Sequence, residues 1–146
     1  MFERFTESAR RVLFWARFEA SQLGGSTIET GHVLLGLVRE DKGKGIVAHV
    51  LSASHVSAAE LCEEIRRRLA APEKISTSVE MPFSAETKHV LELAVDEADR
   101  MAHASIGQEH LLVGLLREEQ SLAARILNSR GLSLESAREA IATAKE

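Results

Sequence analysis

The sequence contains one segment twice, and this internal repeat limits the possible folds more than any other feature. Residues 31–40 read GHVLLGLVRE and residues 109–118 read EHLLVGLLRE. The same shift of 78 positions aligns Phe83 with Phe5. After two extra residues in the first copy, the match resumes at a shift of 76. A duplication of this kind predicts two similar structural units.

Each copy has the pattern of four short helices. Apolar residues recur at helical spacing, small polar residues stand where helix caps are preferred, and glycines stand near helix ends. We predict helices over residues 6–23, 30–39, 46–53, 57–70, 84–101, 107–117, 121–130 and 133–144, with Thr6, Ser57, Ser84 and Ser133 as N-caps. No segment alternates between apolar and polar residues as a strand would. The sequence therefore predicts an all-α fold of two pseudo-symmetric four-helix repeats packed as one unit.

The segment between the copies, APEKISTSVEMP, has no helical period and contains both prolines, Pro72 and Pro82. We therefore expect a single domain, with the following division of the chain: domain 1–146, first repeat 1–71, linker 72–82 and second repeat 83–146.

The composition favours a globular cytoplasmic protein, since 45% of the residues are apolar and 27% are charged. A net charge of -4 disfavours nucleic acid as a partner, because phosphate binding needs a basic surface. Cys62 is the only cysteine, which excludes an intramolecular disulfide and favours a reducing compartment. No apolar run approaches the roughly 18–20 residues that cross a bilayer, so we expect no membrane partner.

The sequence contains no recognisable catalytic motif. The segment nearest to a phosphate-binding loop is DKGKGIV, but Gly45 is followed there by Ile46 and not by lysine. The histidines have no metal-ligand spacing, and His32 and His110 are better explained as hydrogen-bonded residues at helix starts. We therefore expect no enzyme activity, no cofactor and no metal site.

Several segments resemble the Clp N-terminal repeat domain. They are FTESARRVL and GHVLLGLVRE in the first copy and FSAETKHVLELAVDEA and IGQEHLLVGLLRE in the second. The opening MFERFTESARR is most similar to the ClpC branch. That domain stands at the front of Clp-type AAA+ unfoldases and is not itself catalytic. The resemblance implies a recognition platform that receives protein substrates and adaptors for the Clp ATPase and protease machinery.

The ClpC branch recognises phosphorylated arginine in two related pockets, each with a glutamate of a T-E-H segment. The resemblance implies a phosphoarginine-type site at Glu109 and His110. The equivalent of Glu109 in the first repeat is Gly31, and Glu29 lies about 200° around a helix from it, so at most one site is implied. A carboxylate near a helix start can pair with a guanidinium group while backbone N–H groups receive phosphate oxygens.

A comparison of the two copies indicates a second surface. Phe14 and Phe18 lie one helical turn apart, and their equivalents in the second copy are Glu92 and Asp96. Since those two acids must face water, we expect both phenylalanines to face outward, with Trp15 at the border of the patch. Apolar surface of this kind usually marks an interface, here with a second copy of the protein or another domain. Neighbouring helices or the linker could instead cover it.

Two further interpretations stay open. One is a stand-alone protein of the same kind that acts as an adaptor or decoy, by self-association or by docking through the aromatic patch. The other is a small helical enzyme or ligand-binding protein that uses the groove between the repeats. An occupied polar cavity would favour the latter.

Overall fold

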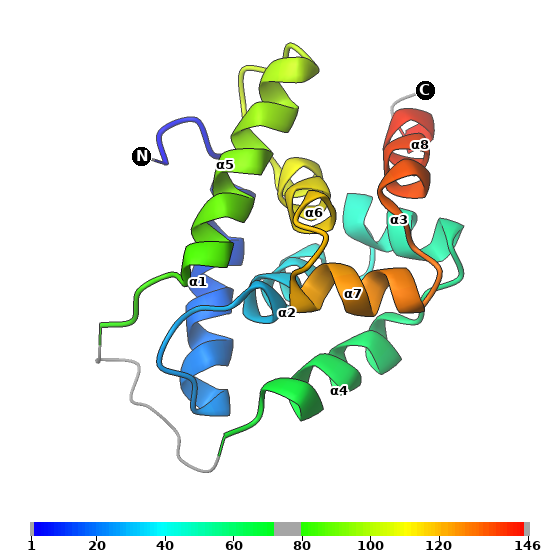
Figure 1. Cartoon of the computed structure of the whole chain (residues 1–146). Helices are drawn as coiled ribbons and strands as arrows, with labels where there is room; N and C mark the ends of the chain where they lie inside the picture. Colours follow the sequence, from blue (N-terminus) through cyan, green and yellow to red (C-terminus); the bar gives the residue numbers. More distant parts are fainter. Residues whose placement is uncertain (1, 72–79, 145–146) are drawn as a thin grey trace.

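The structure is a computed structural model and describes residues 2–71 and 80–144 of the chain. The described residues form eight α-helices, as Figure 1 shows. They are α1 (Glu7–Leu23), α2 (Thr30–Asp41), α3 (Ile46–Ala53), α4 (Ala58–Leu69), α5 (Ala85–Arg100), α6 (Gln108–Arg117), α7 (Leu122–Ser129) and α8 (Leu134–Ala144). The all-α prediction is confirmed, and every predicted helix is present with its ends shifted by no more than two residues.

The predicted caps hold the helix starts. The side-chain oxygens of Thr6, Ser57, Ser84 and Ser133 each accept a hydrogen bond, at 3.1–3.2 Å, from the backbone N–H three residues further on. Such a cap stabilises a helix by about 1 kcal/mol. Gly24 ends α1 with a φ of 86°, a conformation that glycine adopts without steric cost.

The two repeats are interlocked through their first residues. Phe5 forms a single β-bridge with Ile106, and Phe83 forms the equivalent bridge with Ile28. Backbone hydrogen bonds of 2.8–3.1 Å hold each arm to the loop of the other repeat. Each repeat therefore contributes its first residues to the other, and the exchange follows the pseudo-symmetry of the sequence.

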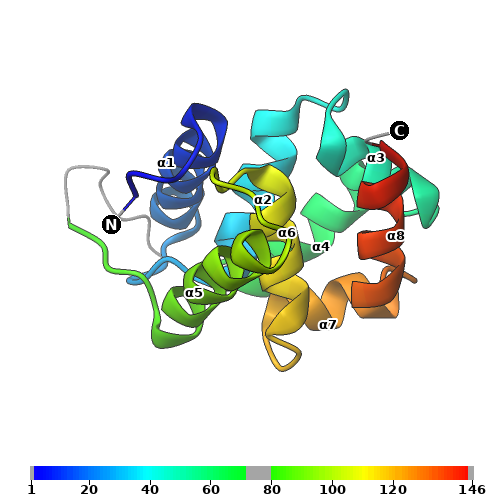
Figure 2. The same ribbon diagram turned by 90° about the horizontal axis from the view of Figure 1, so that it is seen from above.

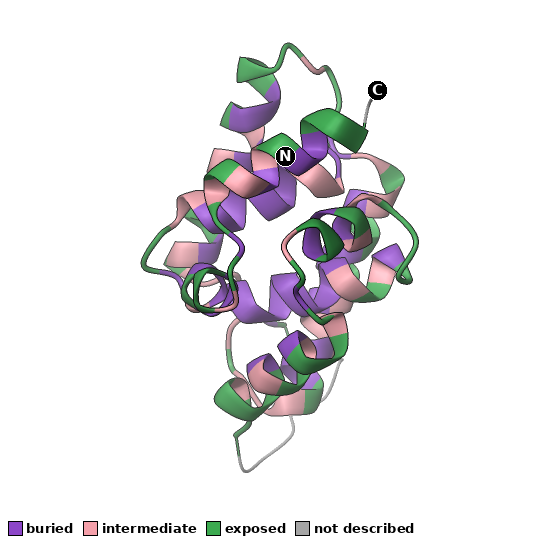
Figure 3. Cartoon of the chain, turned by 90° about the vertical axis from the view of Figure 1, so that its right-hand side faces the viewer, coloured by how far each residue is buried: buried purple, intermediate pink, exposed green. Residues whose placement is uncertain are grey.

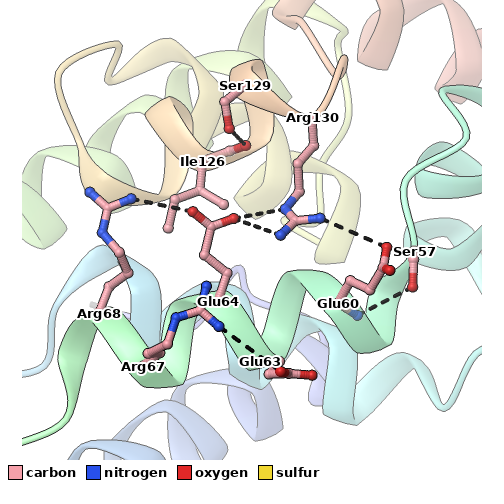
Figure 4. A network of polar contacts seen from close by, with 9 residues as sticks. All are labelled: Ser57, Glu60, Glu63, Glu64, Arg67, Arg68, Ile126, Ser129 and Arg130. Carbon is pink, nitrogen blue, oxygen red and sulfur yellow. Dashed lines mark hydrogen bonds and ion pairs between the residues drawn. The ribbon is translucent and has the colours of Figure 1, made fainter.

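The third and fourth helices also pack across the repeats. As Figure 1 and Figure 2 show, α3 lies against α8 and α4 lies against α7. His49 Nε2 of α3 lies 3.0 Å from the carbonyl oxygen of Ala140 in α8. Arg130, at the end of α7, donates to Glu64 of α4 at 2.8 Å, as seen in Figure 4. This hydrogen bond lowers the pKa of the Glu64 carboxyl.

The second helix of each repeat forms the centre of the core. Residues 30–37 of α2 and 110–116 of α6 are all buried, and Figure 3 shows the buried faces of the helices turned inward. α1 packs on α2, and α5 packs on α6. None of the described helices is long and apolar enough to cross a membrane.

The predicted linker, 72–82, lies mostly outside the described residues, which include only its last three. Met81 is buried, and the carbonyl oxygen of Pro82 accepts a hydrogen bond from the N–H of Ile28 at 2.8 Å. Pro82 therefore takes part in the arm of the second repeat.

Candidate binding site

Glu109 lies in the first turn of α6, whose N-cap is Gly107. Its carboxylate folds back over Gly107 and lies where a Cβ on residue 107 would stand. The methyl group of Thr6, the N-cap of α1, lies 3.9 Å from the same point. The interlocked arm brings these groups together, because the N–H of Thr6 donates to the carbonyl oxygen of Ile106 at 2.9 Å. The starts of α6 and α1 therefore meet beside one carboxylate.

A cavity of about 170 Å³ opens beside Glu109 in the second repeat. Its wall consists of residues from α5, α6 and α8: Glu97, Met101, Glu109, His110, Val113, Arg138, Ile141 and Ala142. The cavity thus brings together the two site residues expected from the sequence, Glu109 and His110, in a wall that combines apolar and charged side chains.

His110 and its equivalent His32 hold the starts of their own helices. The Nδ1 atom of each ring accepts a hydrogen bond of 2.9 Å from the backbone N–H of the N-cap residue, Gly107 or Glu29. The proton of the neutral ring therefore lies on Nε2. A structural role was the expectation for both histidines, and these hydrogen bonds confirm it.

The second ring nitrogen distinguishes the two histidines. His110 Nε2 lies 2.9 Å from Nδ1 of His103. The equivalent of His103 in the first repeat is Gly25, and His32 Nε2 is buried without a hydrogen-bond partner among the described residues. Burial lowers the pKa of His32 to about 4, so this ring is neutral at physiological pH.

A buried carboxylate at the cavity was not expected from the sequence. Glu97 of α5 is 4% exposed and lies 2.8 Å from the guanidinium of Arg138 in α8 and 3.3 Å from that of Arg117 in α6. The hydrogen bond to Glu97 raises the pKa of the Arg138 guanidinium, which stays charged. This ion pair fixes α8 against α5 along one wall of the cavity.

The first repeat contains an equivalent buried acid, Glu19, which lies 3.1 Å from Arg66 of α4. Glu19 and Glu97 align at a shift of 78, and this match was the signal that could have identified them. The arginines do not align, because the sequence equivalent of Arg138 is Cys62, one turn before Arg66. The ion pair is therefore kept although the position of its cation has moved.

The place in the first repeat that corresponds to Glu109 is filled. A Cβ on Gly31 would lie 2.6 Å from Cδ1 of Leu69 and 3.1 Å from Cγ2 of Ile65. The carboxylate of Glu29 accepts a hydrogen bond from the hydroxyl of Thr27 at 2.6 Å. Leu69 thus occupies the space that a side chain at position 31 would need.

The aromatic residues of α1 lie on the outside of the first repeat. Phe14 is 63% exposed, whereas Trp15 and Phe18 are half-buried. The guanidinium of Arg39 stacks 4.0 Å above the ring of Trp15 and lies 5.2 Å from the ring centre of Phe18. The expected outward orientation therefore applies fully to Phe14, while Arg39 covers part of the other two rings.

Three further observations concern the groove between the repeats, the metal-binding side chains and the cysteine. A cavity between the repeats has a volume of only about 70 Å³ and an almost wholly apolar wall: Phe2, Phe5, Leu91, Glu92 and Val95. Within residues 2–71 and 80–144, no three side chains of the metal-binding types gather. Burial raises the pKa of the Cys62 thiol, which disfavours the nucleophilic thiolate.

Known proteins match the chain over nearly its whole length. The model of the Clp repeat (R) N-terminal domain matches residues 4–130 and 82–146. Over 141 residues the chain is 41% identical to the negative regulator of genetic competence ClpC/MecB of Bacillus subtilis (strain 168). This match covers 97% of the chain but only 17% of that protein.

Solved structures are similar as well. The N-terminal domain of the caseinolytic protease associated chaperone ClpD from Arabidopsis thaliana has a TM-score of 0.78 and 33% identity, with 100% of both chains covered. A ClpV N-domain, solved in complex with a VipB peptide, has a TM-score of 0.77. Its identity is 15%, with 97% of this chain and 86% of that chain covered, so this likeness concerns the fold alone.

Proposed function

The chain belongs to the family of Clp repeat N-terminal domains, and on that premise we propose that it is a non-catalytic protein-binding module. It recognises substrates or adaptors for a Clp-type AAA+ unfoldase and its protease. The ClpV N-domain, which has the same fold, binds a VipB peptide, and this supports binding as the role of the fold. The single half-buried cysteine, Cys62, supports a reducing, cytoplasmic location.

The binding site of the proposal is the Glu109 cavity, and its ligand is a phosphoarginine-type side chain. The observation that carries this assignment is the Glu109 carboxylate at the joint start of α6 and α1. A carboxylate can accept two parallel N–H bonds from a guanidinium group. The N–H of Ala9 is taken by the Thr6 side chain, but the N–H groups of Glu7 and Ser8 have no acceptor within α1, so they can receive the phosphate oxygens. His110 contributes by holding the start of α6 in place.

The proposal predicts one site per chain. The first repeat lacks the carboxylate at Gly31, and Leu69 fills the space beside it. A second phosphoarginine in the first repeat would have to displace Leu69 and would find no carboxylate at that place. The stoichiometry of binding therefore tests the assignment as directly as the affinity does.

Calorimetric titration of the protein with free phosphoarginine tests the site. We expect saturable binding at about one ligand per chain, and we expect Glu109→Gln to abolish it, because the amide keeps the shape and removes the charge. Glu92→Gln is the matched control, since it removes an exposed carboxylate from α5, away from the cavity wall. The assignment would be contradicted if millimolar phosphoarginine gave no heat of binding. It would also be contradicted if the Glu109→Gln variant still bound phosphoarginine.

The alternative function is an adaptor or decoy that acts through the aromatic residues of α1. One observation favours it, the 63% exposure of Phe14. Phe14 lies about two helical turns beyond the start of α1, to which the phosphate is assigned, so a protein of this kind can contain both sites.

A further inference from the structure

Two exposed side chains, Phe14 and Arg39, and two half-buried ones, Trp15 and Phe18, form a continuous surface of the first repeat, here named the α1 patch. Trp15 contacts Phe14 and Phe18 edge to face, with ring centres 5.1 Å and 6.0 Å apart. The Arg39 guanidinium lies over Trp15. Aromatic residues and arginine are the side chains that contribute most binding energy at protein interfaces.

The second repeat shows what the α1 patch lacks. There Asp96 takes the place of Phe18, and its carboxylate lies 2.8 Å from Arg117, the equivalent of Arg39. The side chain of Arg117 is only 17% exposed. In the first repeat the corresponding acid is absent, and Arg39 has an exposure of 43% and a longer ion pair, 3.5 Å, to buried Glu19. Arg39 therefore lacks the second carboxylate that Arg117 has, and its guanidinium group is more exposed.

Arg39 is the exposed cation of the patch, because Arg11 beside it is paired with two acids, Glu40 and the 88% exposed Glu7. Arg11, one turn before Trp15 on α1, is 50% exposed and pairs with Glu40 at 2.8 Å. Glu40 is only 8% exposed in its side chain and also accepts the indole N–H of Trp15 at 3.3 Å. A guanidinium group stacked on a ring, as that of Arg39 is, keeps its in-plane N–H donors available. The patch thus presents apolar rings beside one half-exposed cation, Arg39.

We propose that the α1 patch binds an acidic protein segment with an aromatic anchor. The anchor packs on Phe14, and a carboxylate of the segment binds Arg39 in the way that Asp96 binds Arg117. Charge complementarity argues for this partner, since the surface combines the exposed ring of Phe14 with the half-exposed guanidinium of Arg39. None of the four side chains of the patch lines the Glu109 cavity, so the patch is a second site and does not depend on the phosphoarginine assignment.

The chain provides its own reporter for this site, because Trp15 is the only tryptophan and lies inside the patch. The probe is a synthetic peptide of about 12 residues, built from Asp, Glu and Gly with one central Phe. We expect it to change the Trp15 emission in a saturable way. Peptides with Lys in place of the acids, or with Ala in place of Phe, should bind at least about tenfold more weakly.

Phe14→Glu introduces the residue that the second repeat has at the equivalent position. It should lower the affinity for the acidic peptide at least about tenfold. Since Phe14 is 63% exposed, the helix content and the melting temperature should stay close to those of the wild type. If Phe14→Glu has a lower helix content than the wild type, the peptide titration is made with Phe14→Ala instead. Glu92→Gln on the equivalent face of the second repeat should leave the peptide affinity unchanged, and Phe14→Glu should leave the phosphoarginine titration unchanged.

Three results would overturn the proposal. They are no emission change at millimolar acidic peptide, equal binding of the Lys peptide, and full binding in both Phe14 variants. A change of Trp15 emission with protein concentration alone, together with dimers in sedimentation velocity, would assign the patch to a second copy of the chain instead.

Discussion

His32 and His110 occupy the same place in the two repeats, and their second ring nitrogens meet different surroundings. His103 lies 2.9 Å from His110 Nε2, whereas Gly25 takes the place of His103 in the first repeat. His32 is 1% exposed, and its burial holds the pKa near 4. The exchange of histidine for glycine thus leaves His32 Nε2 without a partner among the described residues, and the pKa of this buried ring lies far below that of an unfolded histidine.

This difference predicts a pH dependence of stability. An unfolded histidine has a pKa of about 6.5, so between that value and about 4 the unfolded chain binds a proton that folded His32 does not bind. The free energy of unfolding should therefore fall as the pH drops through this window, by about 3 kcal/mol from His32. His32→Gln keeps a hydrogen-bond acceptor but does not titrate, so its loss of stability should be smaller. Urea unfolding at pH 7, 6 and 5 measures the difference, and parallel curves for both proteins would contradict it.

At the scale of the helices, the duplicated segment contains one glycine in each copy, Gly36 and Gly114. This glycine determines how closely the first two helices of its repeat approach each other. A Cβ on Gly114 of α6 would lie 2.7 Å from the carbonyl oxygen of Val90 in α5. A Cβ on Gly36 of α2 would lie closer still to the carbonyl oxygen of Val12 in α1. Both obstacles are backbone atoms of a helix, which cannot rotate away as a side chain can.

Gly36→Ala and Gly114→Ala should therefore destabilise the protein, each by about 2 kcal/mol. Helix propensity alone would make each glycine-to-alanine change stabilising by about 1 kcal/mol. The sign of the change in unfolding free energy therefore shows whether the steric clash or the helix propensity dominates. Urea unfolding of both variants at neutral pH measures it. A gain in stability in either variant would show that the helices can move apart at little cost.

At the scale of the whole molecule, the two repeats form one structure because they exchange parts. The arm at Phe5 lies on the second repeat and the arm at Phe83 lies on the first, and α3 and α4 pack against α8 and α7. The third and fourth helices of each repeat pack on the central helix of their own repeat and also on helices of the other repeat. We therefore propose that the domain over residues 1–146 is one folding unit and that neither repeat is stable alone.

Splitting the chain tests this proposal. Fragments 1–71 and 80–146 should each show little helix by circular dichroism, because each lacks the partner that covers its helices. Mixed in equal amounts, they should form a 1:1 complex with the helix content of the intact protein. A fragment that folds as a stable monomer would contradict the single folding unit. A fragment that folds only as a dimer would agree with it, since two copies can exchange the same arms.

Much of the fold could be predicted from the sequence. The eight helices, the caps at Thr6 and Ser84 and the burial of the central helices depend on periodicity and on neighbours a few residues away. The cavity at Glu109 was expected only through the resemblance to a family. Its wall, with Glu97 and Arg138, depends on helices far apart in the sequence and was not expected.

The sequence by itself determined the duplication, the helices and the family of this protein, because each of these is a pattern of residues along the chain. Only the tertiary structure showed which described side chains lie at each of the two equivalent places. Leu69 fills the first, and the Glu109 carboxylate lies beside Thr6 at the second. Contacts of this kind arise where α4 or the arm before α1 meets a distant segment. They depend on the side chains that meet in space, which the alignment of the two copies does not contain.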